Sequence, residues 1–211
     1  MSDALYLSNV RLSFPKLIEA TAAQGQPNSP KKFGADLIMP PNHPDFARVM
    51  EAIGKLASDK WKEQAPQVLQ MIQNDRRLRC WGNGSEKIKK LTMKPYEGYQ
   101  DMVYFTTSMN EDRPPVMVRS EDGKPVDNAN TMERTALARK LYGGCYVNAM
   151  VSLWIQDNQY GRGIRMNLNA VQFLRDGEAF GDAAPDVEGV FGAVQGAQAP
   201  AMPTGFPSFF Q

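Results

Sequence analysis

The chain has 211 residues, enough for one well-packed domain, and its 24 Lys and Arg against 23 Asp and Glu give a formal net charge of +1. This balance argues against a uniformly basic nucleic-acid clamp, and a hydrophobic share of 42% argues against wholesale disorder. The two cysteines, Cys80 and Cys145, provide no disulfide framework, so a reducing compartment is expected. Neither a secretory signal pattern nor a bilayer-spanning run of roughly 18–20 apolar residues is found. We therefore expect a single-domain intracellular protein without a membrane contact.

The first predicted elements are two strands and a helix. Residues 4–14 have the spacing of a strand, residues 21–31 have the composition of a loop, and residues 33–39 predict a second short strand. The apolar contacts of the first strand are expected from Leu5, Leu7, Val10, Leu12 and Phe14. Asn42 is placed to cap an amphipathic helix over about 43–63, and residues 68–72 predict a short continuation.

From residue 76 onward the pattern changes to short strands and turns. Residues 101–109, 145–157 and 163–175 alternate between apolar and polar side chains, and NQYGRG at 158–163 suits the loop of a hairpin. One face of this hairpin is apolar, and the other carries Tyr, Trp, Asn and Arg, as a wet binding surface or an ordinary solvated face would. Together the elements predict a mainly β fold: an OB-fold-like, partly open, five-stranded antiparallel barrel with one substantial helix and loop insertions.

The charge divides sharply after Arg175. No Lys or Arg follows this residue, so the last 36 residues carry −5 and residues 1–175 carry +6. Gly, Pro, Ala and Gln dominate the end of the chain and give no periodicity, which predicts a folded domain over 1–177 and a disordered, flexible tail over 178–211. The tail residues expected to act on DNA binding or on partner proteins are the acids Asp182, Asp186 and Glu188 and the terminal rings Phe209 and Phe210.

Catalytic signals are weak. The single histidine, His43, lies at a helix start where a capping or surface role is expected, and neither CxxC nor HExxH spacing occurs. GNGSEK at 82–87 lacks the spacing of a phosphate loop, and DGKP at 122–125 is a turn sequence. We therefore expect no enzymatic activity, no cofactor and no metal.

The stronger signal is for binding, because residues 76–99 interleave cations with aromatic rings. Lys and Arg neutralise phosphates, and exposed rings stack on bases of any identity. The candidate cations of this segment are Arg76, Arg77, Arg79, Lys87, Lys89 and Lys90, and its candidate rings are Trp81, Tyr96 and Tyr99. The candidate DNA-binding residues elsewhere are Lys31, Lys32, Tyr104, Arg113, Tyr146, Trp154, Tyr160, Arg162 and Arg165. Each single ring could equally be part of the core.

Several motifs resemble a family of bacteriophage-encoded single-stranded DNA-binding proteins. They are RLSFPKLIEA, KKFGADLIMPPNHPDF, YEGYQDM, DRPPVM and YGGCYVNAMVSLWIQDNQYGRGIRMNLNAVQFLRDGEAFG, spread over about residues 5–181. The resemblance implies an OB-fold and sequence-independent protection of single strands in replication, recombination or repair, in the cytoplasm of the infected bacterial host. It also implies an acidic tail that competes with DNA and contacts replication proteins such as a polymerase or helicase. Here, however, the acids lie at the start of the tail and the chain ends in SFFQ.

Three other functions stay open at this point: an RNA-binding OB module, a phage structural or scaffolding protein, and a metal-dependent nuclease. The sequence also leaves open whether duplex DNA is bound and whether the protein forms a homodimer.

Overall fold

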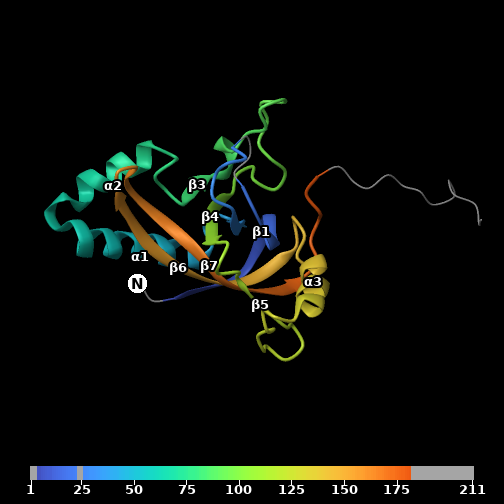
Figure 1. The fold of residues 1–211 in the computed structure, drawn as a ribbon. Helices are drawn as coiled ribbons and strands as arrows, with labels where there is room; N and C mark the ends of the chain where they lie inside the picture. Colours follow the sequence, from blue (N-terminus) through green and yellow to red (C-terminus); the bar gives the residue numbers. More distant parts are fainter. Residues whose placement is uncertain (1–3, 23–25, 182–211) are drawn as a thin grey trace, which may run out of the picture. The chain divides into compact units, whose positions relative to one another are not determined.

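The computed structural model describes residues 4–22 and 26–181, and its framework is a single seven-stranded sheet. Five strands are long, and Figure 1 labels them β1 (Leu5–Thr21), β2 (Lys32–Met39), β4 (Val103–Asn110), β6 (Tyr146–Asn158) and β7 (Gly161–Arg175). Two are three residues long, β3 (Trp81–Asn83) and β5 (Val116–Val118), and they lie at the two ends of the order β3-β4-β2-β1-β6-β7-β5. The mainly β expectation is confirmed, and the sheet has two short strands more than the expected five.

The sheet curls into a partly open barrel. All neighbouring strands pair antiparallel except β5 and β7, which are parallel. β4 also contacts β7 across the barrel, and residues 78–80 connect them at the backbone level. The Leu78 carbonyl accepts from the Ile164 N–H of β7 at 2.8 Å, and the Cys80 carbonyl accepts from the Thr106 N–H of β4 at 2.7 Å.

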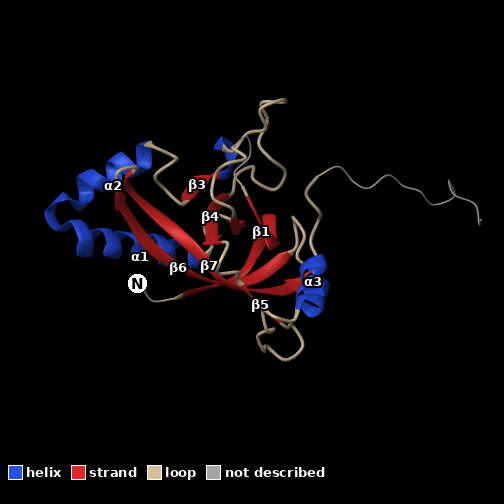
Figure 2. Ribbon diagram, in the orientation of Figure 1, coloured by secondary structure: helices blue, strands red, loops and turns tan. Residues whose placement is uncertain are grey.

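Two consecutive helices cover one side of the barrel, as Figure 2 shows in blue beside the long red β6–β7 arm. They are α1 (Pro44–Trp61) and α2 (Ala65–Asn74), joined by the 3₁₀ turn η1 (Lys62–Gln64). The cap of α1 is His43 rather than Asn42, because the His43 Nδ1 accepts from the Asp45 N–H at 3.2 Å. None of the helices in residues 4–22 and 26–181 combines the length and apolar character needed to cross a bilayer.

A further helix, α3 (Thr131–Lys140), was not expected from the sequence. It has no apolar stripe, and the residue it buries is Arg134. The Arg134 guanidinium donates to the carbonyls of Leu17 and Pro115, each at 3.2 Å. Hydrophobic periodicity did not reveal this helix, because only Leu137 and Ala138 pack against the core and the buried side chain is a charged one.

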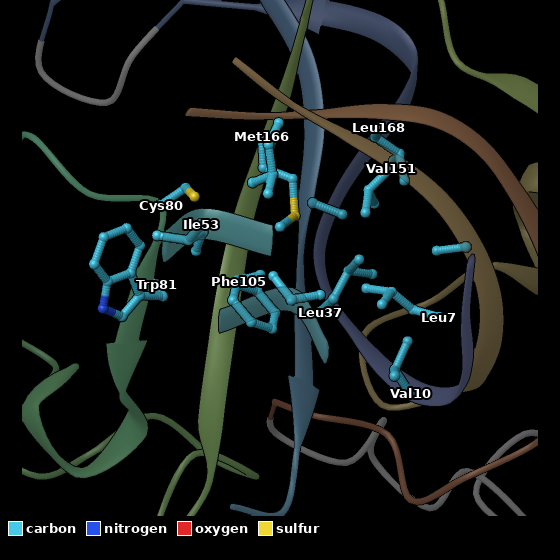
Figure 3. Close-up of a cluster of buried hydrophobic side chains, with 14 of the residues drawn as sticks. Leu7, Val10, Leu37, Ile53, Cys80, Trp81, Phe105, Val151, Met166 and Leu168 are labelled. Atoms are coloured by element: carbon cyan, nitrogen blue, oxygen red, sulfur yellow. The ribbon is translucent and has the colours of Figure 1, made fainter. Parts of the chain in front are cut away.

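The core lies between the inner faces of the strands and α1 and α2, and Figure 3 shows its centre. Strand alternation sends every second side chain of β6 and β7 inward. As expected, Val147, Ala149, Val151 and Leu153 of β6 are buried. Cys80 and Cys145 are buried and free, in agreement with the absence of a disulfide framework.

Trp81 belongs to this core, and its expected role as an exposed stacking ring is wrong. The ring is 7% exposed, and its Nε1–H donates to the Gln73 Oε1 of α2 at 2.9 Å. Figure 3 shows it beside Cys80 and Ile53. A ring enclosed in this way cannot stack on a base without unfolding of the surrounding packing.

Candidate nucleic-acid interface

A buried carboxylate organises the outer face of β2. Asp36 is 4% exposed, and its Oδ1 accepts from the Thr106 hydroxyl at 2.8 Å. Its Oδ2 accepts from the Tyr99 hydroxyl at 2.5 Å and from the Lys87 ammonium. Removing a carboxylate from water costs several kcal/mol unless such partners compensate. Burial and then the Asp36 charge raise the pKa of Tyr99, so this phenol stays a donor.

The segment over 84–102 crosses this outer face and covers it. Tyr99 is fully buried and packs with Ile38 and Tyr104 in a second apolar cluster, which Tyr96 and Phe180 border. The expected stacking roles of Tyr99 and Tyr104 are therefore wrong, because both rings face protein atoms. The rings of this segment anchor it to the sheet, and Lys87 is the counter-ion of Asp36. This structural role accounts for the interleaving of rings and cations.

Lys87 is shared between this network and the surface. Its side chain keeps 23% exposure, and its Nζ lies 4.6 Å from the ring centroid of Tyr104 and 5.2 Å from those of Phe14 and Tyr99. Such contacts stabilise a cation on aromatic faces. Part of its positive charge is neutralised by Asp36, so less remains for a phosphate.

Phe14 is the aromatic residue of this surface that sequence reasoning missed. It is 45% exposed and has φ of +47°, an uncommon backbone conformation for a bulky side chain. Alternation placed Phe14 with Leu12 on the apolar face, but the β1–β2 register shifts between Ser13 and Lys16. Pro15 has no N–H to donate to the ladder at this shift, and Phe14 turns outward to meet Tyr96 edge-on at 5.1 Å.

Two adjoining cavities open around Phe14. One has a volume of about 520 Å³, and its lining includes Phe14, Lys16, Lys32, Lys87 and Thr106. The other has a volume of about 380 Å³, and its lining includes Phe14, Lys89, Tyr96, Glu97 and Phe180. We call them together the Phe14 hollow. Of the predicted DNA-binding residues, the hollow gathers Lys32, Lys87, Lys89 and Tyr96, and exposed Lys31 precedes Lys32.

A larger groove of about 1030 Å³ lies between α2 and the tip of the β6–β7 hairpin. It brings together four more of the predicted residues: Arg77, Tyr160, Arg162 and Arg165. Tyr160 is 75% exposed. The Arg165 Nε donates to the Gln156 Oε1 at 3.0 Å, and burial lowers the pKa of Arg165. Trp154, 37% exposed, lies opposite Arg165 in the strand register and flanks this hairpin groove.

The other predicted residues are placed less favourably. Tyr146 lies beneath two guanidinium groups, 3.4 Å from Arg175 and 5.6 Å from Arg11 to the ring centroid. Arg76 and Arg79 contact Glu86, and the Arg79 side chain is 8% exposed. Lys90 and Arg113 line neither the Phe14 hollow nor the hairpin groove. Lys90 is exposed in the loop after Lys89, and Arg113 follows β4.

Residues 176–181 fasten the end of the described chain beside the Phe14 hollow. The Phe180 N–H donates to the Gly143 carbonyl at 2.8 Å, and the Gly181 N–H donates to the Glu97 Oε2 at 2.6 Å. The hydrogen bond from the Gly181 N–H lowers the pKa of Glu97, and Lys89 lowers it further. The Phe180 ring fills the space beside Gly98, where φ is +75° and a Cβ would lie 2.1 Å from the ring.

Asp182, Asp186, Glu188, Phe209 and Phe210 lie outside the described residues. Within residues 4–22 and 26–181, no group of three or more His, Cys, Asp or Glu side chains could hold a metal ion.

A family model described as the ssDNA-binding protein of Enterobacter phage Enc34 matches residues 4–199. The chain belongs to this family. A relative from Acyrthosiphon pisum secondary endosymbiont phage 1, described as putative protein p50, is 34% identical over 176 residues, which are 82% of this chain and 84% of the relative.

Two solved structures of this family have the same fold. The single-stranded DNA-binding protein from bacteriophage Enc34 in complex with ssDNA superposes with a TM-score of 0.64 at 23% identity, over 84% of this chain and 89% of that one. The same Enc34 protein in another structure has a TM-score of 0.59 at 22% identity, over 89% of both chains.

Replacing the buried carboxylate tests whether Asp36 holds this surface together. We expect Asp36→Asn to lower the free energy of unfolding by about 3 kcal/mol, the lower end for a broken buried pair because Lys87 is partly exposed. Asp112→Asn is the control, since Asp112 is 70% exposed in its pair with Arg113 and should cost less than about 0.5 kcal/mol. Urea denaturation measures both, and equal losses would contradict the assignment.

Proposed function

We propose that this protein binds single-stranded DNA without sequence preference and acts in phage DNA replication, recombination or repair in the cytoplasm of the infected host. It performs no catalysis in this role. The observation that carries the proposal is the Phe14 hollow, an aromatic and cationic surface on a chain that belongs to the Enc34 ssDNA-binding family. A structure of the Enc34 protein in complex with ssDNA supports it further.

The chemistry of the hollow suits a single strand better than a duplex. Phe14 and Tyr96 offer rings on which unpaired bases stack, and Lys16, Lys32 and Lys89 lie within reach of the phosphates. Stacking is sequence-tolerant because every base has a π face. A duplex keeps its bases stacked on one another and offers none to these rings.

The hairpin groove is proposed as a second contact for the same strand. Leu78 lines the groove, and Cys80 bonds to Thr106, which lines the hollow. Leu78 and Cys80 are separated by one residue, about 7 Å of extended chain, and we infer that one strand follows this connection from the hollow to the groove. Tyr160 and Arg162 would then contact a base and a phosphate there.

The Phe14 substitution tests the hollow. We expect Phe14→Ala to weaken binding of an oligothymidine by about 5- to 150-fold, the range for losing one stacked base. Tyr6→Ala is the matched control, because Tyr6 is a 52% exposed ring on the same strand that lines neither part of the hollow. Fluorescence anisotropy measures both variants, and equal affinities for wild type and Phe14→Ala would contradict the proposed site. An oligouridine competitor distinguishes an RNA-binding role.

The tail is proposed to modulate binding and to contact partner proteins. The Gly181 N–H donates to Glu97, which pairs with Lys89 of the hollow, and Asp182 is the next residue in the sequence. Asp182, Asp186 and Glu188 would compete with phosphates for these cations, while Phe209 and Phe210 would dock on a polymerase or helicase.

Neutralising the three tail acids tests the competition. Asp182→Asn, Asp186→Asn and Glu188→Gln together should raise affinity for single-stranded DNA several-fold at low salt, and the gain should shrink as salt screens the charges. Replacing Phe209 and Phe210 with Ala is the control, which should leave DNA affinity unchanged. A salt series of anisotropy titrations measures this, and an unchanged affinity in the acid variant would refute the competition.

A further inference from the structure

The loop over 88–95, which we call the lysine loop, exposes apolar side chains among cations. Leu91 is fully exposed at 100%, and Met93 is 69% exposed. Lys90 and Lys94 in the same loop are exposed as well. No Asp or Glu lies between Glu86 and Glu97, so the loop has a purely positive charge. Figure 1 shows it in green, projecting beyond the sheet.

The lysine loop is closed and anchored rather than loosely attached. Ile88 and Pro95 form a β-bridge at its base, and the Lys89 N–H donates to the Lys94 carbonyl at 2.8 Å. The Met93 N–H donates to the Lys89 carbonyl at 2.9 Å, and Met93 has φ of +54°. Backbone hydrogen bonds thus hold the apolar tip outward against the tendency of such side chains to pack on protein.

The base of the loop is continuous with the Phe14 hollow. Lys87 precedes the loop and is held by Asp36, while Lys89 pairs with Glu97 at 3.3 Å and lines the hollow with Tyr96. A strand lying in the hollow therefore passes the base of the loop. Leu91 and Met93 follow Lys89 in the same loop, outside the lining of the hollow.

We propose that the lysine loop is a wedge for the junction where a single strand enters a duplex. Leu91 and Met93 would insert against the terminal base pair and unstack it, as apolar side chains do when they enter between base steps. Lys90 and Lys94 would contact phosphates of the two diverging strands. This inference rests on the proposed binding of single-stranded DNA in the hollow.

The charge and the position of the lysine loop favour a duplex end as its occupant. Phosphates of two strands meet at a junction, and the loop presents lysines on both sides of its apolar residues. A strand bound in the hollow is unpaired. Unpaired and stacked bases adjoin where a duplex ends, so a duplex end is the DNA structure that would reach the tip of the loop. An anionic lipid surface or a partner protein would have no need of the neighbouring hollow.

A DNA hairpin with a single-stranded arm tests the wedge in the full-length chain. It carries 2-aminopurine at the pair next to the junction, whose fluorescence rises when the base unstacks. We expect wild type to raise this fluorescence about 3-fold or more at saturation. The double variant Leu91→Ser with Met93→Ser should lose most of this rise, while its affinity for the single-stranded arm alone stays within about 2-fold.

The matched control is Met132→Ser, because Met132 is 85% exposed on α3 and should leave the signal unchanged. A full fluorescence rise in the double variant would overturn the wedge. If the double variant keeps the fluorescence rise and loses only its binding to vesicles containing phosphatidylglycerol, the wedge would be overturned in favour of a lipid contact. Failure of wild type to bind the arm would instead contradict the proposed function.

Discussion

The outer face of the barrel depends on the compensation of one buried charge. Asp36 lies on β2, where neighbouring side chains are all buried, and its oxygens are satisfied by Thr106, Tyr99 and Lys87. Tyr99 and Lys87 belong to the segment over 84–102, so the carboxylate fastens that segment to the sheet. Because the lysine loop and Tyr96 lie in the same segment, their positions follow from this one compensated charge.

The sequence predicted the framework well because strand alternation is a direct signal of which face is buried. The β6–β7 hairpin and the helix after β2 follow it, and five long strands appear where a five-stranded barrel was expected. The site was predicted less well. Cations interleaved with rings indicated 76–99, but Trp81 and Tyr99 are core, since composition does not distinguish an exposed ring from one that anchors a covering segment. Phe14 was missed because only the register shift at Pro15 turns it outward.

The proposed binding surface is assembled from segments that are far apart in the chain. The bulge of β1 contributes Phe14, the covering segment contributes Lys89 and Tyr96, and residues 176–181 close one end with Phe180. Arg11 links these parts, because its guanidinium lies 4.3 Å from the Phe180 ring centroid and donates to the Glu178 carbonyl at 2.6 Å. A local motif search cannot recover such a surface, whereas the charge division at Arg175 is visible in the sequence alone.

Ultraviolet crosslinking shows whether a single strand lies on the Phe14 hollow. Full-length protein is irradiated with an oligothymidine, and the adducts are located by mass spectrometry. We expect adducts on Phe14 and Tyr96, with weaker ones on Tyr160 in the hairpin groove. Adducts confined to residues outside the Phe14 hollow and the hairpin groove, such as those of α3, would contradict binding at the hollow.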